Sequence, residues 1–254
     1  MIDFTGQAAL VTGSSRGIGA AIVQRLAGLG ARVAVHYRSD RAAAERTLGD
    51  LPGQGHVLVS ADLADPDAAR AMVEQVVAGL GGIDVLVNNA GIWLEHPLDE
   101  VSYDAWRDAW RRTIETNLFG TADTTYCVAR HMIETGRAGR IVNVSSRGAF
   151  RGEPQYPAYG ASKAAMNSMG QSLAQHLAPH GITVTTVAPG FVETDMAAAF
   201  LAGPQGDAVR RQSPLGRVAT PAEIADVVAF LASGHAVIAT GAIVDANGAS
   251  YLRT

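Results

Sequence analysis

The stretch "VTGSSRGIGAAI" at residues 11–22 decides the fold of this chain. It follows an apolar run typical of a buried strand and opens an Ala-rich stretch with helical periodicity. Gly13 and Gly17 can adopt backbone conformations closed to other residues, and Gly19 lets a helix pack close to a sheet. The free N–H groups at the start of such a helix attract an anion such as a pyrophosphate. Taken alone, the glycine cluster is also compatible with a simple tight strand-to-helix turn.

Short apolar runs and helical patterns alternate along the whole chain. Buried strands rich in Val, Leu and Ile are predicted at residues 8–13, 32–37, 56–60, 83–91, 140–146, 182–190 and 242–248. Ala-rich helices are predicted between them, among others at residues 17–29, 66–80, 159–178 and 221–232. Two of these helices begin with good N-cap and N1 pairs, Asp65 with Pro66 and Thr220 with Pro221.

The alternation implies a parallel sheet with helices on both faces. A closed barrel of alternating strands and helices would share this pattern and the length of 254 residues. The glycine loop directly after the first strand favours a Rossmann-like doubly wound sheet instead. No repeat, low-complexity tract or linker interrupts the pattern, so we predict one α/β domain over residues 1–254.

The composition excludes several classes of function. Apolar residues make up 48% and charged residues 17%, and the net charge of −4 gives no basic footprint for nucleic acid. The first residues lack the basic region of a signal peptide, and no apolar run is long enough to span a membrane. Cys127 is the one cysteine, which excludes a disulfide within the chain. These features predict a soluble cytoplasmic protein.

Six short motifs occur in the order typical of the short-chain dehydrogenase/reductase family. They are "TGSSRGIG" (12–19), "NNAG" (88–91), "TNLFG" (116–120), "SS" (145–146), "YGASK" (159–163) and "PGFVETDM" (189–196). The chain resembles this family over nearly its whole length and is similar to β-ketoacyl carrier-protein reductases and their relatives. The resemblance implies an oxidoreductase that interconverts a ketone and a secondary alcohol by hydride transfer. It also implies that the nicotinamide lies at the carboxyl ends of the strands.

The cofactor is predicted to be NADP(H) rather than NAD(H). An NAD enzyme usually places an acid at the end of the second strand to hold the ribose 2′-OH, and here the family position holds Tyr37, followed by Arg38. Arg16 lies inside the glycine loop, and two guanidinium groups suit a 2′-phosphate. The alternative is that Arg38 and Arg41 merely solvate the loop. The resemblance implies further cofactor contacts at Ser15, Ile18, Asp62, Leu63, Asn89, Ala90, Gly91, Pro189, Gly190, Val192 and Thr194.

Tyr159 and Lys163 form the predicted catalytic pair. Lys163 is the only lysine in the chain, and positions four apart on a helix share a face. Hydride transfer to a ketone leaves an alkoxide that needs a proton, and Tyr159 can act as the general acid and base. A free phenol has a pKa of about 10, and a nearby cation is expected to lower the pKa of Tyr159. A surface ion-pair role for Lys163 is the alternative.

The resemblance supplies two partners for this pair. Ser146 lies 13 residues before Tyr159, the spacing of the family, and would hydrogen-bond the substrate carbonyl. Asn117 would support Lys163 through water. Ser145 is the serine next to Ser146, and Tyr156 is a second tyrosine close to Tyr159. We assign neither of them to catalysis. No metal is predicted, because His176 and His180 are separated by Pro179 and lack a third ligand.

The substrate is predicted to be a small carbonyl or alcohol compound. The family's substrate-lining positions correspond here to Trp93, Ser146, Arg147, Gln155, Tyr156 and Phe191, with Phe150 and Glu153 in the same stretches. Their mixture indicates a substrate with apolar and polar or anionic parts. Residues 193–215 are expected to form a mobile lid over the substrate. Of two arginines assigned to carrier-protein docking in the family, Arg137 matches one and His180 replaces the other.

Two further expectations concern assembly and alternative roles. The resemblance implies that helical segments at 104–135 and 158–178 pack against their copies, giving a homodimer or homotetramer. A β-ketoacyl carrier-protein reductase proper and a non-catalytic NADP-binding regulator remain alternative functions. A sugar-nucleotide epimerase or dehydratase also uses Tyr-xxx-Lys, but such chains usually carry a further substrate domain.

Overall fold

One twisted parallel sheet organises the molecule. The computed structural model describes residues 1–253, without the side chains of residues 196 and 199. In these residues seven strands pair in the order β3-β2-β1-β4-β5-β6-β7. Their bounds are β1 Ala8–Val11, β2 Arg32–Tyr37, β3 Val57–Ser60, β4 Val85–Asn88, β5 Gly139–Val144, β6 Ile182–Pro189 and β7 Ile243–Ala246. The prediction of a doubly wound parallel sheet is confirmed.

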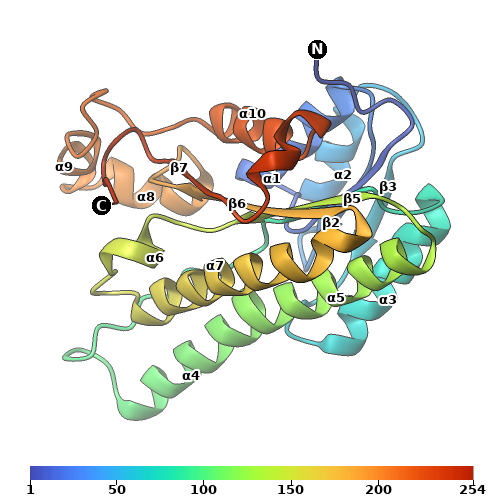
Figure 1. The fold of residues 1–254 in the computed structure, drawn as a ribbon. Helices are drawn as coiled ribbons and strands as arrows, with labels where there is room; N and C mark the ends of the chain where they lie inside the picture. The colour runs from blue at the N-terminus through green and yellow to red at the C-terminus, as the bar shows by residue number, and fades with distance from the viewer. Residues whose placement is uncertain (254) are drawn as a thin grey trace.

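Helices cover both faces of the sheet, as Figure 1 shows. One face carries α1 Gly17–Gly28, α2 Arg41–Gly49 and α10 Pro221–Leu231, whose apolar residues share a core with the strands. The other face carries α3 Pro66–Leu80, α5 Gly120–Glu134 and α7 Pro157–Leu177, which close the second core. The helix α4, Tyr103–Ile114, lies outside α7 on that face. Strands buried on both sides read as near-continuous apolar runs, as the sequence predicted.

Short helical segments complete the chain. A π-helical turn at Glu115–Phe119 joins α4 to α5, and the 3₁₀ segments are Ala178–His180 and Gly234–Ala239. The short helix α6, Gly148–Arg151, precedes α7. The predicted lid holds α8 Asp195–Ala202 and α9 Gly206–Arg210, with a small apolar cluster of its own. No helix in residues 1–253 combines the length and apolarity needed to cross a membrane.

The predicted helix starts are confirmed. Asp65 accepts hydrogen bonds from the backbone N–H groups of Asp67 and Ala68, with Pro66 in the first turn of α3. Thr220 and Glu223 form a reciprocal capping box at the start of α10. Both caps satisfy N–H groups that have no partner inside the helix.

The strand order reverses at β1, and this reversal locates the site. Val11 of β1 pairs with Val35 of β2 on one side and Val87 of β4 on the other. The loops after β1 and β4 therefore leave the same edge of the sheet side by side and diverge to opposite faces. In doubly wound sheets ligands bind in the crevice at this point. Two predicted strands, 83–91 and 140–146, end earlier than expected, because residues 89–91 and 145–146 turn into this crevice.

Candidate active site

The glycine loop has the geometry of a dinucleotide cradle. Gly13 and Gly17 have φ angles of +62° and +58°, a conformation that other residues rarely adopt. A Cβ atom on Gly19 would overlap the carbonyl oxygen of Gly13 and lie 2.6 Å from Nδ2 of Asn89. No side chain caps the start of α1, so its first N–H groups stay free for an anion. The roles predicted for these three glycines fit the structure.

Two polar side chains, His36 of β2 and Asn89 just after β4, hold this loop in place. Nδ2 of Asn89 donates to the carbonyl oxygens of Thr12 and Gly13, each at 2.9 Å. The backbone N–H of Gly13 donates to Nδ1 of His36 at 2.8 Å. Because Nδ1 accepts, the ring proton lies on Nε2, which donates to the carbonyl of Ala61 at 3.1 Å. The loop is thus fixed by β4 and β2 before any ligand arrives.

His36 is a residue that the motif analysis missed. Its ring is 2% exposed, and burial lowers its pKa below the usual 6.5, partly opposed by the hydrogen bond with Ala61 and the charge of Asp62. The signal available in the sequence was a histidine in the otherwise apolar strand "RVAVHY". A buried polar side chain needs hydrogen-bond partners, and here they are the glycine loop and the end of β3.

A cavity of about 360 Å³ runs from the glycine loop to Tyr159. Every residue predicted to bind the cofactor lines it, namely Gly13, Ser15, Arg16, Gly17, Ile18, Gly19, Tyr37, Arg38, Asp62, Leu63, Asn89, Ala90, Gly91, Tyr159, Lys163, Pro189, Gly190, Val192 and Thr194. These residues come from the ends of five strands and the loops that follow, and from helix α7. Other residues that were not predicted also line the cavity, including His36, Asp40 and Asp195.

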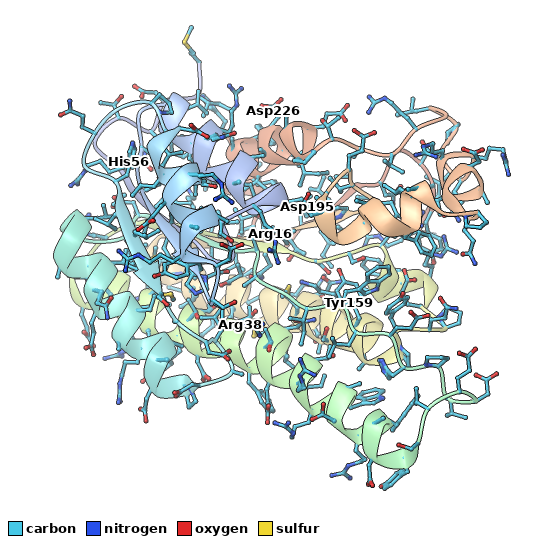
Figure 2. The ribbon with its side chains drawn as sticks, turned by 180° about the vertical axis from the view of Figure 1, so that it is seen from behind. Arg16, Arg38, His56, Tyr159, Asp195 and Asp226 are labelled. Atoms are coloured by element: carbon cyan, nitrogen blue, oxygen red, sulfur yellow. The ribbon has the colours of Figure 1, made fainter. Side chains whose placement is uncertain are left out.

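Two arginines lie at the glycine-loop end of the cavity. Figure 2 labels Arg16, Arg38 and Tyr159, and all three line this one cavity. Nη1 of Arg16 lies 3.8 Å from a carboxylate oxygen of Asp40, and both side chains are largely exposed. Asp40 also caps α2 by accepting from the N–H of Ala43. Arg38 forms no ion pair with any described residue, so its guanidinium is available to a ligand.

The catalytic residues predicted from the sequence meet at the other end. Tyr159 and Lys163 lie one turn apart on α7, and Ser146 follows β5 directly. Nζ of Lys163 donates to the carbonyl oxygen of Val144 at 2.8 Å and lies 5.8 Å from the ring centroid of Tyr159. Ser146 Oγ accepts from the N–H of Gly148 at 3.0 Å, which leaves its own proton free for another acceptor.

Asn117 is fully buried in the π-helical turn and ties the site together. Its Oδ1 accepts from the N–H of Ile92 at 2.8 Å, and its Nδ2 donates to the Ile92 carbonyl at 3.0 Å and to Ser162 Oγ at 3.2 Å. A Cβ atom on Gly91 would lie 3.4 Å from Oδ1 of Asn117 and 3.6 Å from Nζ of Lys163. The amide therefore holds the loop after β4 beside the lysine. Irregular π-helical turns are often found at functional sites.

Burial dominates the electrostatics of the catalytic pair. Burial raises the pKa of Tyr159 to about 12, and the negative charge of Glu153 acts in the same direction. A hydrogen bond with Ser146 acts in the opposite direction and lowers the pKa. Burial also lowers the pKa of Lys163 to about 8. The expected lowering of the phenol pKa by Lys163 is not found. The reason is that desolvation of the phenolate outweighs its partners while Nζ faces the Val144 carbonyl.

Aromatic rings form the substrate end of the cavity. The rings of Trp93 and Tyr156 stack with centroids 3.9 Å apart. Phe191 lies edge-on to Trp93 at 6.4 Å and stacks on Phe200 at 5.3 Å. Trp93, Ser146, Arg147 and Phe191 line the cavity as predicted. The structure does not bring Gln155 and Tyr156 into it, because Gln155 is exposed and Tyr156 packs behind Trp93.

Arg147 is buried rather than facing solvent. It is 4% exposed, and its guanidinium lies 5.2 Å from the ring centroid of Phe191. It donates to Ser250 Oγ at 2.6 Å and to Gln212 Oε1 at 2.7 Å. Burial lowers its pKa from the usual 12.5. The Arg147 side chain, next to Ser146 in the sequence, thus connects the cavity to the predicted lid and to the C-terminal tail.

The other residues considered from the sequence have structural places. Ser145 donates from Oγ to the carbonyl of Lys163 at 3.3 Å, and Trp106 packs against Trp110 with centroids 6.0 Å apart. Arg137 is held by Oδ1 of Asp84 at 2.9 Å and by the Gly81 carbonyl at 3.0 Å. Residues 1–253 contain no group of three His, Cys, Asp or Glu side chains placed to hold a metal ion.

Comparisons with known proteins agree with this geometry. A family model described as enoyl-(acyl carrier protein) reductase matches residues 13–248. The 3-oxoacyl-[acyl-carrier-protein] reductase FabG of Escherichia coli is 38% identical over 251 residues, 99% of this chain and 100% of that protein. A short-chain dehydrogenase from Burkholderia cenocepacia, solved with NADP, is 36% identical with a TM-score of 0.87, covering 97% of this chain and 98% of its own. A 3-ketoacyl-(acyl-carrier-protein) reductase from Brucella melitensis, solved with NADH, is 32% identical with a TM-score of 0.89, covering 98% and 100%.

Proposed function

The chain belongs to the short-chain dehydrogenase/reductase family, and we propose that it reduces a small ketone to a secondary alcohol, and catalyses the reverse reaction, with NADP(H) and with Tyr159 as general acid and base. One observation carries this proposal. Ser146, Tyr159 and Lys163 lie at one end of the same cavity whose other end is the glycine cradle. A dinucleotide that fills the cradle would extend to the tyrosine. The chain is thus an oxidoreductase with a small-molecule substrate.

Each protein group has a defined task in this reaction. The nicotinamide supplies the hydride, and the protein holds the carbonyl and provides the proton. Ser146 already accepts from Gly148, so its hydroxyl proton can turn from Tyr159 to the substrate carbonyl oxygen when substrate binds. Tyr159 gives its proton to the oxygen as negative charge develops there. A phenol pKa of about 12 keeps Tyr159 protonated at neutral pH, the form that reduction needs.

Lys163 is the cation for this proton transfer. It is 3% exposed, and among the residues that the structure describes its side chain donates to the neutral carbonyl of Val144 rather than to an acid. Its charge is therefore not neutralised by a neighbouring carboxylate. A compact ammonium can interact with the phenol and with ribose hydroxyls together, which a planar guanidinium does less well. Asn117 acts as a positioning residue, since it fixes the Ile92 loop beside this lysine.

NADP(H) is favoured over NAD(H) by the charges at the glycine-loop end. Arg16 and Arg38 line the cavity, and guanidinium groups match phosphate oxygens. Asp40 partly offsets Arg16 at 3.8 Å, so Arg38 carries most of the proposed preference. Among the solved neighbours, the Burkholderia protein was solved with NADP and the Brucella protein with NADH. The preference must therefore be tested for this chain.

A carrier-protein substrate is the second candidate. It is supported by the 38% identity with the 3-oxoacyl-[acyl-carrier-protein] reductase of Escherichia coli. Two observations count against it. Arg137, at a position assigned to carrier docking, is already bound to Asp84 and Gly81. The second position holds His180, which is not permanently charged. A non-catalytic nucleotide-binding regulator would not need the complete set of catalytic residues found here.

A homo-oligomer is the proposed assembly. On helix α5 the side chain of Tyr126 is exposed, at 67% of its full accessible surface. Phe119, directly before this helix, is 57% exposed. Exposed aromatics on one long helix are typical of an interface. Closed symmetric dimers and tetramers are the common solution for such chains. The single-domain organisation and the cytoplasmic location predicted from the sequence stay predictions.

A substrate panel tests the proposed function. Purified protein is mixed with NADPH and a series of ketones, or with NADP⁺ and the matching alcohols, and cofactor absorbance is followed. We expect turnover in at least one chemical class, and its loss in Tyr159→Phe. A 3-oxoacyl thioester carried on acyl carrier protein belongs in the same panel. The proposal fails if the protein binds NADPH and leaves every carbonyl compound unchanged.

A further inference from the structure

Glu153 is a carboxylate without a partner inside the catalytic cavity. It lies on the loop between α6 and α7, is partly buried, and lines the cavity together with Ser146 and Tyr159. Its side chain forms no hydrogen bond and no ion pair with any residue that the structure describes. Burial raises the pKa of this carboxyl group above its usual 4.5, opposed by the charges of Arg147 and Arg151. A carboxylate that lines a cavity and has no protein partner is available to accept a hydrogen bond from a bound ligand.

The position of Glu153 is fixed by packing. A Cβ atom on Gly148 would lie 2.8 Å from Cγ and 2.8 Å from Oε1 of Glu153, so the carboxylate lies directly against that glycine. The N–H of the same glycine donates to Ser146 Oγ. The Glu153 carbonyl accepts from the N–H of Tyr156 at 2.9 Å, which holds the loop. A side chain at position 148 would therefore push the Glu153 carboxylate away from its present place.

The carboxylate also faces the reacting end of the site. Its negative charge helps to raise the pKa of the Tyr159 phenol and the pKa of the Tyr156 phenol. The group therefore lies within electrostatic reach of the atom that gives the proton to the substrate. A substrate carbonyl held between Ser146 and Tyr159 would place its neighbouring groups within the cavity that Glu153 also lines.

The nearby cations do not satisfy Glu153. Arg147 donates to Ser250 and Gln212, and Arg151 donates to Gln212 at 3.1 Å. Neither guanidinium comes within ion-pair distance of the carboxylate in the described residues. Both would nevertheless repel a cationic substrate group from this corner. The ligand group that suits this corner is therefore a neutral hydrogen-bond donor.

We propose that Glu153 is a specificity-determining residue that accepts a hydrogen bond from a hydroxyl group beside the substrate carbonyl. This inference rests on the proposed ketone reduction and names its substrate class as hydroxyketones, with vicinal diols in the reverse direction. The flat rings of Trp93 and Phe191 contact the apolar part of the substrate. A 3-oxoacyl thioester fits poorly, because its second carbonyl oxygen is an acceptor and would face a carboxylate.

A matched pair of ketones tests the inference. The ring compounds α-hydroxycyclohexanone and α-methylcyclohexanone differ in a hydroxyl against a methyl group of similar size. With NADPH, we expect the wild-type kcat/KM to be roughly 10- to 100-fold higher for the hydroxyketone, the range expected for a hydrogen bond to a charged group. Glu153→Leu should reduce this ratio to about one, and Glu153→Gln, which keeps an acceptor oxygen, should retain part of it.

The control is Glu100→Gln, which removes the same charge from an exposed loop residue and should leave the ratio unchanged. Thermal unfolding checks that each variant is folded. A wild-type ratio near one, or a Glu153→Leu enzyme that keeps the preference, overturns the inference while ketone reduction itself stands. If neither ketone is turned over, the proposed function fails for this class. Calorimetric binding of both ketones to the NADPH-loaded Tyr159→Phe protein then still decides the inference, because equal affinities overturn it.

Discussion

Nδ1 of His36 accepts a hydrogen bond of 2.8 Å from the backbone N–H of Gly13, the first glycine of the cofactor loop. The other ring nitrogen donates to the Ala61 carbonyl. A doubly protonated ring has no acceptor, so protonation would break the bond to Gly13. The neutral form of His36 therefore belongs to the folded state, in agreement with the lowered pKa that burial gives it.

Stability is expected to decrease in acid through this residue. The unfolded chain binds a proton at His36 near pH 6.5, and the folded chain binds it only at lower pH. The stabilisation is thus fully present above about pH 6.5 and is lost as the pH falls through the lowered folded pKa. His36→Asn keeps an acceptor near Gly13 and cannot titrate. Thermal unfolding from neutral to mildly acidic pH should show a flatter pH dependence in this variant, and parallel curves would contradict the role of His36.

The second prediction concerns the choice of cofactor. Arg38→Asp should place an acid where a 2′-phosphate is expected and where an NAD enzyme holds the ribose. We expect the ratio of NADPH to NADH affinity to fall by roughly 10- to 100-fold, the range for charge-assisted hydrogen bonds. Arg41→Asp is the matched control, because Arg41 pairs with Glu45 and does not line the cavity. A wild type that binds NADH as tightly as NADPH in a fluorescence titration would refute the assignment.

Arg147 provides a test of the predicted lid. Its guanidinium connects Gln212, in the lid segment 193–215, with Ser250 of the C-terminal tail. Arg147→Lys keeps the positive charge but lacks the planar guanidinium that hydrogen-bonds Gln212 and Ser250 together. We expect faster cleavage within the lid segment in limited proteolysis and a raised KM. Arg151→Lys is the control, since Arg151 is exposed and makes a single longer bond to Gln212. Equal cleavage rates in wild type and Arg147→Lys would show that this connection does not order the lid.

Local patterns in the sequence predicted the scaffold and most of the site. The glycine loop, the capped helices and the pair Tyr159 and Lys163 depend on neighbours within one turn or one strand, which sequence spacing reports directly. Four of the six motifs, in the glycine loop and at residues 88–91, 145–146 and 189–196, lie at or just after strands that end at the same edge, so their order predicted the cavity. The other two motifs, at residues 116–120 and 159–163, lie on helices. The strand ends at 89–91 and 145–146 were misplaced, since an apolar run does not show where its backbone leaves the sheet.

Long-range contacts were beyond such patterns. Arg147 is bonded to residues 65 and 103 positions away, so the sequence left open whether it faced solvent. The pKa of Tyr159 was expected to fall because the lysine is four residues away. Burial by residues from several loops decides it instead. The lack of a partner for Glu153 is likewise a property of the assembled cavity and not of any motif.

The oligomeric state is the fourth prediction. Light scattering at micromolar concentration should give a multiple of the chain mass of 26.4 kDa. Tyr126→Arg places a charge on the exposed face of α5 and should shift the protein toward the monomer if this face is the interface. Leu98→Arg, at an exposed loop position outside the long helices, is the control. A wild-type mass near 26.4 kDa would refute the proposed assembly.

The last prediction separates a catalytic role of Lys163 from a structural one. Lys163→Arg keeps the positive charge, so a purely structural role predicts little harm. The Nζ of Lys163 is buried and donates to the Val144 carbonyl at 2.8 Å, and a planar guanidinium cannot reproduce this contact while it also serves the phenol and the ribose. We expect kcat/KM to fall by roughly 10²–10⁴-fold, the range that general acid–base catalysis contributes. Cofactor binding, measured by fluorescence titration, should weaken only moderately.

Tyr159→Phe should lose a similar factor, because it removes the proton donor while the ring and its packing remain. If the two residues act as a unit, the double variant loses far less than the product of the single losses. Multiplicative losses would mean that lysine and tyrosine act independently. A folded Lys163→Arg enzyme with the wild-type kcat/KM would mean that a single positive charge suffices at this position. The use of the chain's one lysine here would then have no catalytic reason.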